Sequence, residues 1–258
     1  MKPSFFLSRA LLAAAALCAC GGAVAATAGS MSVTGVQFQI IDLTPHDGID
    51  AGISFTSFYG NVSTSVSNLS TWSFPSDRQD TNGELINSAT VVDRDRATAS
   101  LSEAGGLHLG VERHDSAAGK ITAGSKGYSA YTFVLAPNTK LIVTGNAQIR
   151  NDVSGPWADN PYKGHNLFNL LTLTIQSYGW TEDKWEQRFR SGVRGAESVD
   201  FDEQFSLSAS NTSGVGKEMR FSTSAILTAA NPVPEPATYA MFGLGLMMLG
   251  AIARRKRG

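Results

Sequence analysis

The stretches VDFDEQFSLSA (residues 199–209) and MRFSTSAIL (residues 219–227) decide the fold class of this chain. In both, the apolar residues at alternate positions fall on one face: Val199, Phe201, Phe205, Leu207 and Ala209, then Met219, Phe221, Ala225 and Leu227. Because successive side chains of a strand point to opposite faces, each stretch is expected to be a strand with one buried face. Residues 210–216 between them, SNTSGVG, are turn-rich and longer than a tight hairpin needs.

The same alternation recurs in five earlier segments: Val36–Leu43, Ile53–Tyr59, Tyr128–Leu135, Lys140–Ile149 and Leu167–Tyr178. Residues 136–139, APNT, predict a short turn in a strand–turn–strand unit. Closely spaced strands without intervening helices favour an all-β fold, a single antiparallel β-sandwich of jelly-roll type over residues 26–230. Two segments do not alternate. Residues 73–96 are polar and are expected to be a long loop, and residues 181–190 fit either a helix or an exposed loop.

The N-terminus has the three parts of a secretory signal peptide, predicted to span residues 1–25. Lys2 and Arg9 supply the positive region, an apolar run follows, and Ala23-Val24-Ala25 forms an A-x-A site with cleavage before Ala26. The two cysteines of the chain, Cys18 and Cys20, both lie in this leader. A second interpretation makes Cys20 the lipidated residue of a lipoprotein box. Cleavage at Ala25 would leave a mature chain without any disulfide.

The C-terminus is expected to span a membrane. Residues 237–253 carry no charge over 17 positions, which is about 26 Å of helix. The cluster Arg254, Arg255, Lys256 and Arg257 follows and is expected to stay in the cytoplasm within the tail 254–258, which places the body outside the inner membrane. Before the span, residues 231–236 hold three prolines and predict an extended stalk.

The order of Val233-Pro234-Glu235-Pro236, an apolar span and an Arg-rich end resembles the PEP-CTERM sorting signal. The resemblance implies export by a Gram-negative bacterium and recognition by a membrane-embedded exosortase near the Pro-Glu-Pro motif. It also implies a precursor tethered to the inner membrane and a mature protein at the cell surface or in the exopolysaccharide matrix. It covers about a tenth of the chain and says little about the activity of the body.

The charge of the body argues against a nucleic-acid partner. Without the leader and residues 231–258, the chain has 15 basic and 21 acidic residues, a net charge of −6. A surface that binds phosphates should instead be basic.

Four groups of residues have side chains that could support chemistry or ligand binding. His108 and His114, with Glu112 and Asp115 nearby, fall on one strand face but do not meet a zinc spacing, so no metal site is predicted. Two acidic groups in loops fit a structural calcium ion, although neither has the EF-hand pattern. They are Asp77, Asp80, Asn82 and Glu84, and Asp42, Asp47 and Asp50. Without a G-x-S-x-G or H-E-x-x-H motif, the chain is not expected to be an enzyme and no catalytic residue is assigned.

Aromatic side chains supply the fourth constellation, because flat rings can stack on sugars. Trp180 and Trp185 are the candidate glycan contacts, although tryptophans in sandwiches also commonly bury their area against the core. The sequence therefore predicts an exported surface or matrix protein without a cofactor. Its alternatives are a carbohydrate-binding module and, third, a glycan-active enzyme.

Overall fold

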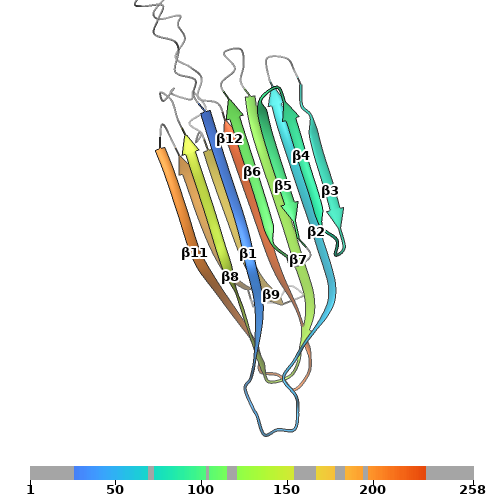
Figure 1. The fold of residues 1–258 in the computed structure, drawn as a ribbon. Helices are drawn as coiled ribbons and strands as arrows, with labels where there is room; N and C mark the ends of the chain where they lie inside the picture. Colours follow the sequence, from blue (N-terminus) through green and yellow to red (C-terminus); the bar gives the residue numbers. More distant parts are fainter. Residues whose placement is uncertain are drawn as a thin grey trace, which may run out of the picture.

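The computed structural model describes residues 26–68, 73–102, 105–114, 121–153, 167–177, 184–193 and 197–230. Twelve strands and no helix lie in these ranges (Figure 1). The strands are β1 (Ala26–Asp42), β2 (Ile53–Asn68), β3 (Ser76–Thr81), β4 (Ile86–Val92), β5 (Asp95–Leu101), β6 (Leu107–His114), β7 (Ile121–Leu135), β8 (Thr139–Val153), β9 (Leu167–Ser177), β10 (Lys184–Val193), β11 (Glu197–Asn211) and β12 (Lys217–Ala230). In the same ranges, no helix is long and apolar enough to cross a membrane.

The strands form two six-stranded antiparallel sheets. Sheet I has the order β11-β8-β1-β6-β5-β4, and sheet II has the order β10-β9-β12-β7-β2-β3. One hydrophobic cluster lies between them and takes side chains from both, such as Leu141 and Phe205 of sheet I and Phe133 and Phe221 of sheet II. The all-β prediction with two antiparallel sheets is confirmed.

The predicted strand faces are also confirmed. In β8, the inward positions from Thr139 to Val153 are buried and alternate with more exposed ones. In β12, Met219, Phe221, Ala225 and Leu227 are at most 1% exposed. Full burial of a large apolar side chain contributes about 1.5–3 kcal/mol to the free energy of folding. Burial of these inward side chains is therefore the main contribution that holds the two sheets together.

The connections differ from those expected. The turn at residues 136–138 passes from β7 in sheet II to β8 in sheet I, and the β11–β12 connection also crosses between the sheets. Neighbours in sequence therefore face each other across the core. A jelly roll has eight strands in two Greek keys, whereas the described part of this sandwich has twelve strands with a β4-β5-β6 meander. Alternation specifies which face of a strand is buried, but it does not specify the neighbouring strand.

Two segments without clear alternation also form strands. The expected long loop at residues 73–96 contains β3, β4 and the start of β5. Small hydroxyl residues occupy its inward positions: the Thr64 hydroxyl lies 2.8 Å from that of Ser88 and 2.7 Å from that of Thr90, all three buried. Because the inward side chains here are polar, these strands show no alternation of apolar and polar residues in the sequence. Of residues 181–190, which are expected to form a helix or an exposed loop, the described part 184–190 belongs to the edge strand β10.

The sandwich is elongated, with a wide end and a narrow tip (Figure 1). Ala26 pairs with His114 and Ala230 pairs with Thr122, which places the start of β1 and the end of β12 together at the wide end. The tip is formed by the β1–β2, β7–β8 and β11–β12 connections. The chain therefore leaves the sandwich at the wide end.

Candidate functional site

Most of the site residues predicted from the sequence lie outside the described ranges. These are the sorting motif Val233, Pro234, Glu235 and Pro236, the basic cluster Arg254, Arg255, Lys256 and Arg257, and Trp180, together with Cys20. Trp185 is described. It lies on the edge strand β10 opposite Ile175, is half-buried, and packs against the core. Its role as a glycan contact stays a prediction.

The histidine constellation falls on the outer face of sheet I. His108 and His114 are both exposed on one face of β6, as their even spacing predicts. The Nδ1 atom of His114 lies 2.9 Å from the Arg94 carbonyl oxygen. Within the described ranges, no group of three or more His, Cys, Asp or Glu residues is placed to hold a metal ion.

The two acidic groups considered for calcium are engaged in local hydrogen bonds. The Asp47 carboxylate accepts bonds from the Thr44 hydroxyl at 2.5 Å, the Ile49 N–H at 2.8 Å and the Asn138 amide at 2.8 Å, and these bonds lower its pKa. The pKa of Asp80 is lowered first by its hydrogen bond with Arg78 and then by that with Tyr59. Asp77 and Asp80 lie in the strand β3 and not in a loop, and calcium binding at either group stays untested.

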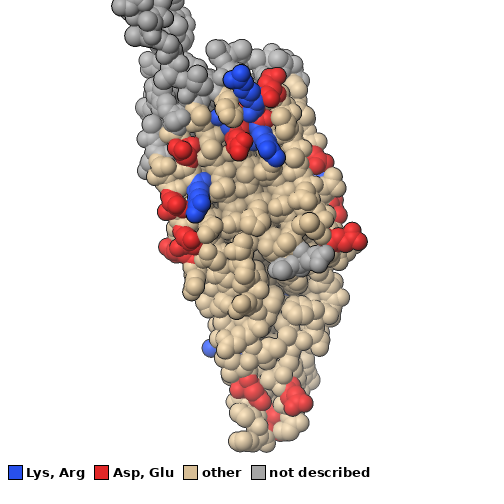
Figure 2. Space-filling model, viewed as in Figure 1, with Lys and Arg blue, Asp and Glu red and all other residues tan. Residues whose placement is uncertain are grey.

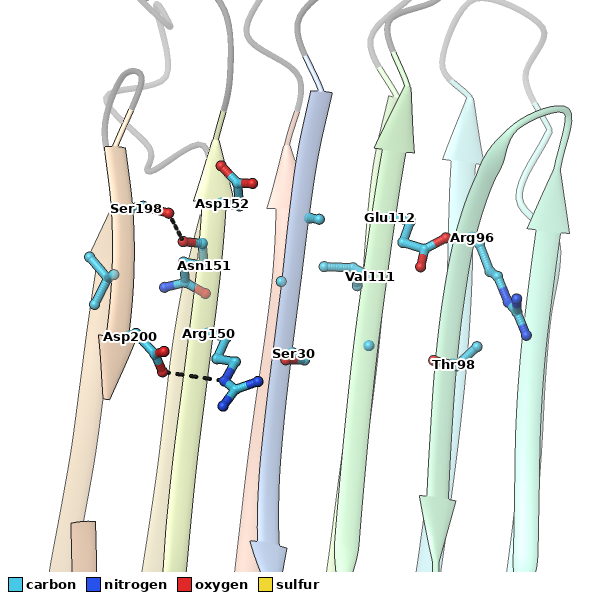
Figure 3. A pocket seen from close by; sticks show the side chains of 14 residues that line it. Ser30, Arg96, Thr98, Val111, Glu112, Arg150, Asn151, Asp152, Ser198 and Asp200 are labelled. Atoms are coloured by element: carbon cyan, nitrogen blue, oxygen red, sulfur yellow. Dashed lines mark hydrogen bonds and ion pairs between the residues drawn. The ribbon is translucent and has the colours of Figure 1, made fainter. Parts of the chain in front are cut away.

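A hollow of the described surface lies on the outer face of sheet I, near the wide end. It has a volume of about 590 Å³ and is shown from close by in Figure 3. Its floor is one row of residues that pair across neighbouring strands: Arg150 of β8 is opposite Ser30 of β1, which is opposite Gly110 of β6, which is opposite Thr98 of β5. Ser30, Gly110 and Thr98 are small residues on three strands that neighbour one another in the sheet, so the surface there is lower than at the adjoining rows.

Two neighbouring rows flank this floor, and each wall mixes longer side chains with small ones. The upper wall is the next row toward the wide end, with Asp152, Ala28, Glu112 and Arg96 paired across the same strands. The lower wall is the row on the other side, with Gln148, Ser32, His108 and Ser100. A second hollow of about 610 Å³ shares Ser30, Arg96, Thr98, Gly110 and Arg150 with the first and extends over the lower wall to Asn87. We call the combined depression the cross-strand trough.

An ion pair closes one end of the cross-strand trough. The Arg150 Nε atom lies 3.3 Å from Asp200 Oδ1, and Arg150 extends from β8 toward Ser30 (Figure 3). Beside it, Asp202 accepts hydrogen bonds from Asn146 at 2.6 Å and Gln148 at 2.7 Å, which lower its pKa. Asp202 is thus held as a carboxylate that orients Gln148 in the lower wall.

The charges of this face are unevenly distributed. Lys and Arg side chains gather near the wide end together with Asp and Glu, whereas the charged side chains visible at the tip are all Asp or Glu (Figure 2). The cross-strand trough lies in the upper charged region and mixes both signs: Arg96 and Arg150 against Glu112, Asp152 and Asp200. This constellation was missed from the sequence because its members come from four strands whose order only the structure gives. The signal that could have drawn attention was the small residue set Ala28, Ser30 and Ser32 on an outward face.

The protein is thus an all-β sandwich that carries a polar trough with charges of both signs on the outer face of one sheet. Comparison with known proteins adds one finding. Residues 232–257 match the family model of the PEP-CTERM protein-sorting motif. No curated protein and no solved structure matches the chain. The motif identifies the chain as a candidate exosortase substrate. It implies an exported, membrane-anchored precursor that is processed for the cell surface.

Proposed function

We propose that this protein is a non-catalytic component of the bacterial cell surface or of its exopolysaccharide matrix. The observation that carries the proposal is the position of the sorting motif. It begins at residue 232, two residues after β12 ends at Ala230. The sorting segment is therefore joined directly to a central strand of the sandwich. This arrangement is expected of a folded domain that is sorted to the cell surface through its C-terminal segment.

The charge pattern supports the topology of the precursor. The cations of residues 254–257 would stay in the cytoplasm, residues 237–253 would span the inner membrane, and the wide end of the sandwich would face that membrane. Cleavage near Pro234-Glu235-Pro236 would then release the sandwich with its short extended stalk. The inner membrane and an exosortase are partners of the precursor, and the matrix surrounds the product.

The test is a fractionation of the producing bacterium. Deletion of residues 231–258 should move the sandwich from the surface fraction to the medium or the periplasm. The triple substitution Pro234→Ala, Glu235→Ala and Pro236→Ala should leave an unprocessed chain in the inner membrane. Pro232→Ala is the matched control and should fractionate as wild type.

Unchanged surface fractionation of both the deletion and the triple variant would overturn the sorting role. Release of reducing sugar from the host's own exopolysaccharide by the purified protein would overturn the non-catalytic part and favour the glycan-active alternative.

A second candidate function, carbohydrate binding, is favoured by the cross-strand trough. Hydrogen-bonding side chains line both of its walls, and such groups fix the orientation of ligands in polar sites. The stacking role of Trp180 and Trp185 is a separate proposal, tested by Trp180→Ala and Trp185→Ala.

A further inference from the structure

We propose that the cross-strand trough is a binding site for a neutral polysaccharide, laid across the strands of sheet I. The inference rests on the proposed surface or matrix role, and it names the ligand class and the face that takes it. It places the ligand on sheet I, away from Trp185 of sheet II, at residues that no motif singles out.

The geometry of the trough fits an extended ligand. The floor of Ser30, Gly110 and Thr98 continues to Ala89 of β4, which pairs with Thr98. Strands are spaced about 4.8 Å apart, so the floor from β1 to β4 runs for roughly 15 Å. The two wall rows are four residues apart along each strand, or roughly 13 Å. The site is thus a channel perpendicular to the strands, open at the β4 edge and closed by Arg150 and Asp200.

The floor is low for a structural reason. A Cβ atom built at Gly110 would lie 2.6 Å from the Thr98 hydroxyl oxygen, so any larger residue there would displace the floor. Ser30 is exposed, and no larger side chain covers it from its own row apart from Arg150 (Figure 3). The row therefore leaves the backbone of three strands within reach of a ligand.

The chemistry of the walls selects a ligand that both donates and accepts hydrogen bonds. Glu112 and Asp152 can only accept, Arg96 can only donate, and Gln148 and Asn87 do both. Hydroxyl groups of sugars satisfy all of these side chains, because each hydroxyl donates one bond and accepts others. The mixed set distinguishes the trough from a site for a purely accepting or purely donating ligand.

The charges argue for a neutral polymer. An acidic polysaccharide would meet Glu112, Asp152 and Asp200 in the trough and a body whose net charge is −6. A polycation would meet Arg96 and Arg150. The residues that line the trough include no Phe, Tyr or Trp, so hydrogen bonds rather than stacking on large rings would carry the affinity.

The test is affinity electrophoresis of the full chain, purified from its host in a mild detergent, through gels that contain one polysaccharide each. Dextran, a mixed-linkage β-glucan and galactomannan are the neutral probes, and alginate and polygalacturonate are the acidic ones. We expect retardation by at least one neutral probe and by neither acidic probe.

Two kinds of variant locate the site. Ser30→Ile and Thr98→Ile fill the floor without changing charge, and Arg96→Gln removes a charged donor. Arg96→Gln should weaken retardation about tenfold, which corresponds to the loss of one hydrogen bond to a charged group, and each floor variant should weaken it at least as much by blocking the ligand. Ser65→Ile and Arg188→Gln make the same changes on sheet II and should bind as wild type. Thermal unfolding of each variant checks that it is folded, and Arg96→Gln, at an exposed position, keeps the test valid if a floor variant does not fold.

Three outcomes would overturn the inference: no retardation by any neutral probe, retardation by acidic probes alone, or equal retardation of wild type and the trough variants. None of these outcomes changes the fractionation result. The ligand proposal and the sorting proposal can therefore fail independently of each other. Normal sorting with lost binding in Arg96→Gln would support both.

Discussion

At the scale of single residues, Asn211 holds together the connections at the tip. Its side chain is 1% exposed. The amide nitrogen donates to the carbonyl oxygens of Leu135 at 3.0 Å, Ala136 at 3.0 Å and Val215 at 2.8 Å, and the amide oxygen accepts from Ser213. One side chain thus ties the β7–β8 turn to the β11–β12 loop, both of which cross between the sheets.

We expect Asn211→Ala to destabilise the protein by about 1–3 kcal/mol, because it leaves buried carbonyl oxygens without a donor. For a domain of this size, each kcal/mol lowers the melting temperature by roughly 2–4 °C. Circular dichroism during thermal unfolding measures the change. Asn82→Ala, at an exposed turn residue, is the control and should unfold with wild type. Identical melting of Asn211→Ala and wild type would show that water replaces these bonds at no cost.

At the scale of elements, glycines on the inner faces let the two sheets approach. A Cβ atom at Gly60 of β2 would overlap the side chain of Leu101 of β5, and one at Gly127 of β7 would overlap Leu107 of β6. Both leucines are at most 1% exposed. Each glycine therefore provides a depression that receives a leucine from the opposite sheet, in an interior that tolerates little change of volume.

Gly60→Ala should therefore destabilise the protein by about 1–3 kcal/mol through overpacking, although alanine is ordinarily better in a strand. Gly124→Ala in β7 is the matched control, because its Cβ would lie 3.5 Å or more from the nearest atom, the Ser65 hydroxyl oxygen. It should be neutral or stabilise by about 0.5–1 kcal/mol. Urea unfolding gives both free energies. If the two variants changed stability equally, the close approach of the sheets at Gly60 would not matter.

The same elements show what can be predicted from the sequence. Seven of the twelve strands were identified from alternation, because residues such as Phe205, Leu207 and Phe221 mark a buried face directly. β3 and β4 were missed because Thr64, Ser88 and Thr90 make a polar interior. The trough could not be predicted, since Ser30, Gly110 and Thr98 become neighbours only through the strand order β1-β6-β5.

At the scale of the whole molecule, the first and the last strand of the sandwich, β1 and β12, are both central strands of their sheets. β1 pairs with β6 and β8 in sheet I, and β12 pairs with β7 and β9 in sheet II. The predicted cleavages of a leader and of the tail would therefore have to act outside Ala26 and Ala230, because a cut inside either strand would disrupt the middle of a sheet. The fold itself sets the limits within which the two processing events can occur.

A truncation pair tests this constraint. A chain of residues 26–230 should unfold in one cooperative transition, whereas a chain of residues 26–216 should not fold. Loss of β12 separates β9 and β10 from the rest of sheet II and removes Met219, Phe221 and Leu227 from the core. At about 1.5–3 kcal/mol each, these three side chains alone contribute roughly 5–9 kcal/mol. That sum approaches the entire net stability of a typical domain, about 5–15 kcal/mol. Neither chain contains a cysteine, so no disulfide can compensate. Far-UV circular dichroism with a thermal ramp measures the difference, and a cooperative transition of the shorter chain at an unchanged temperature would contradict the central role of β12.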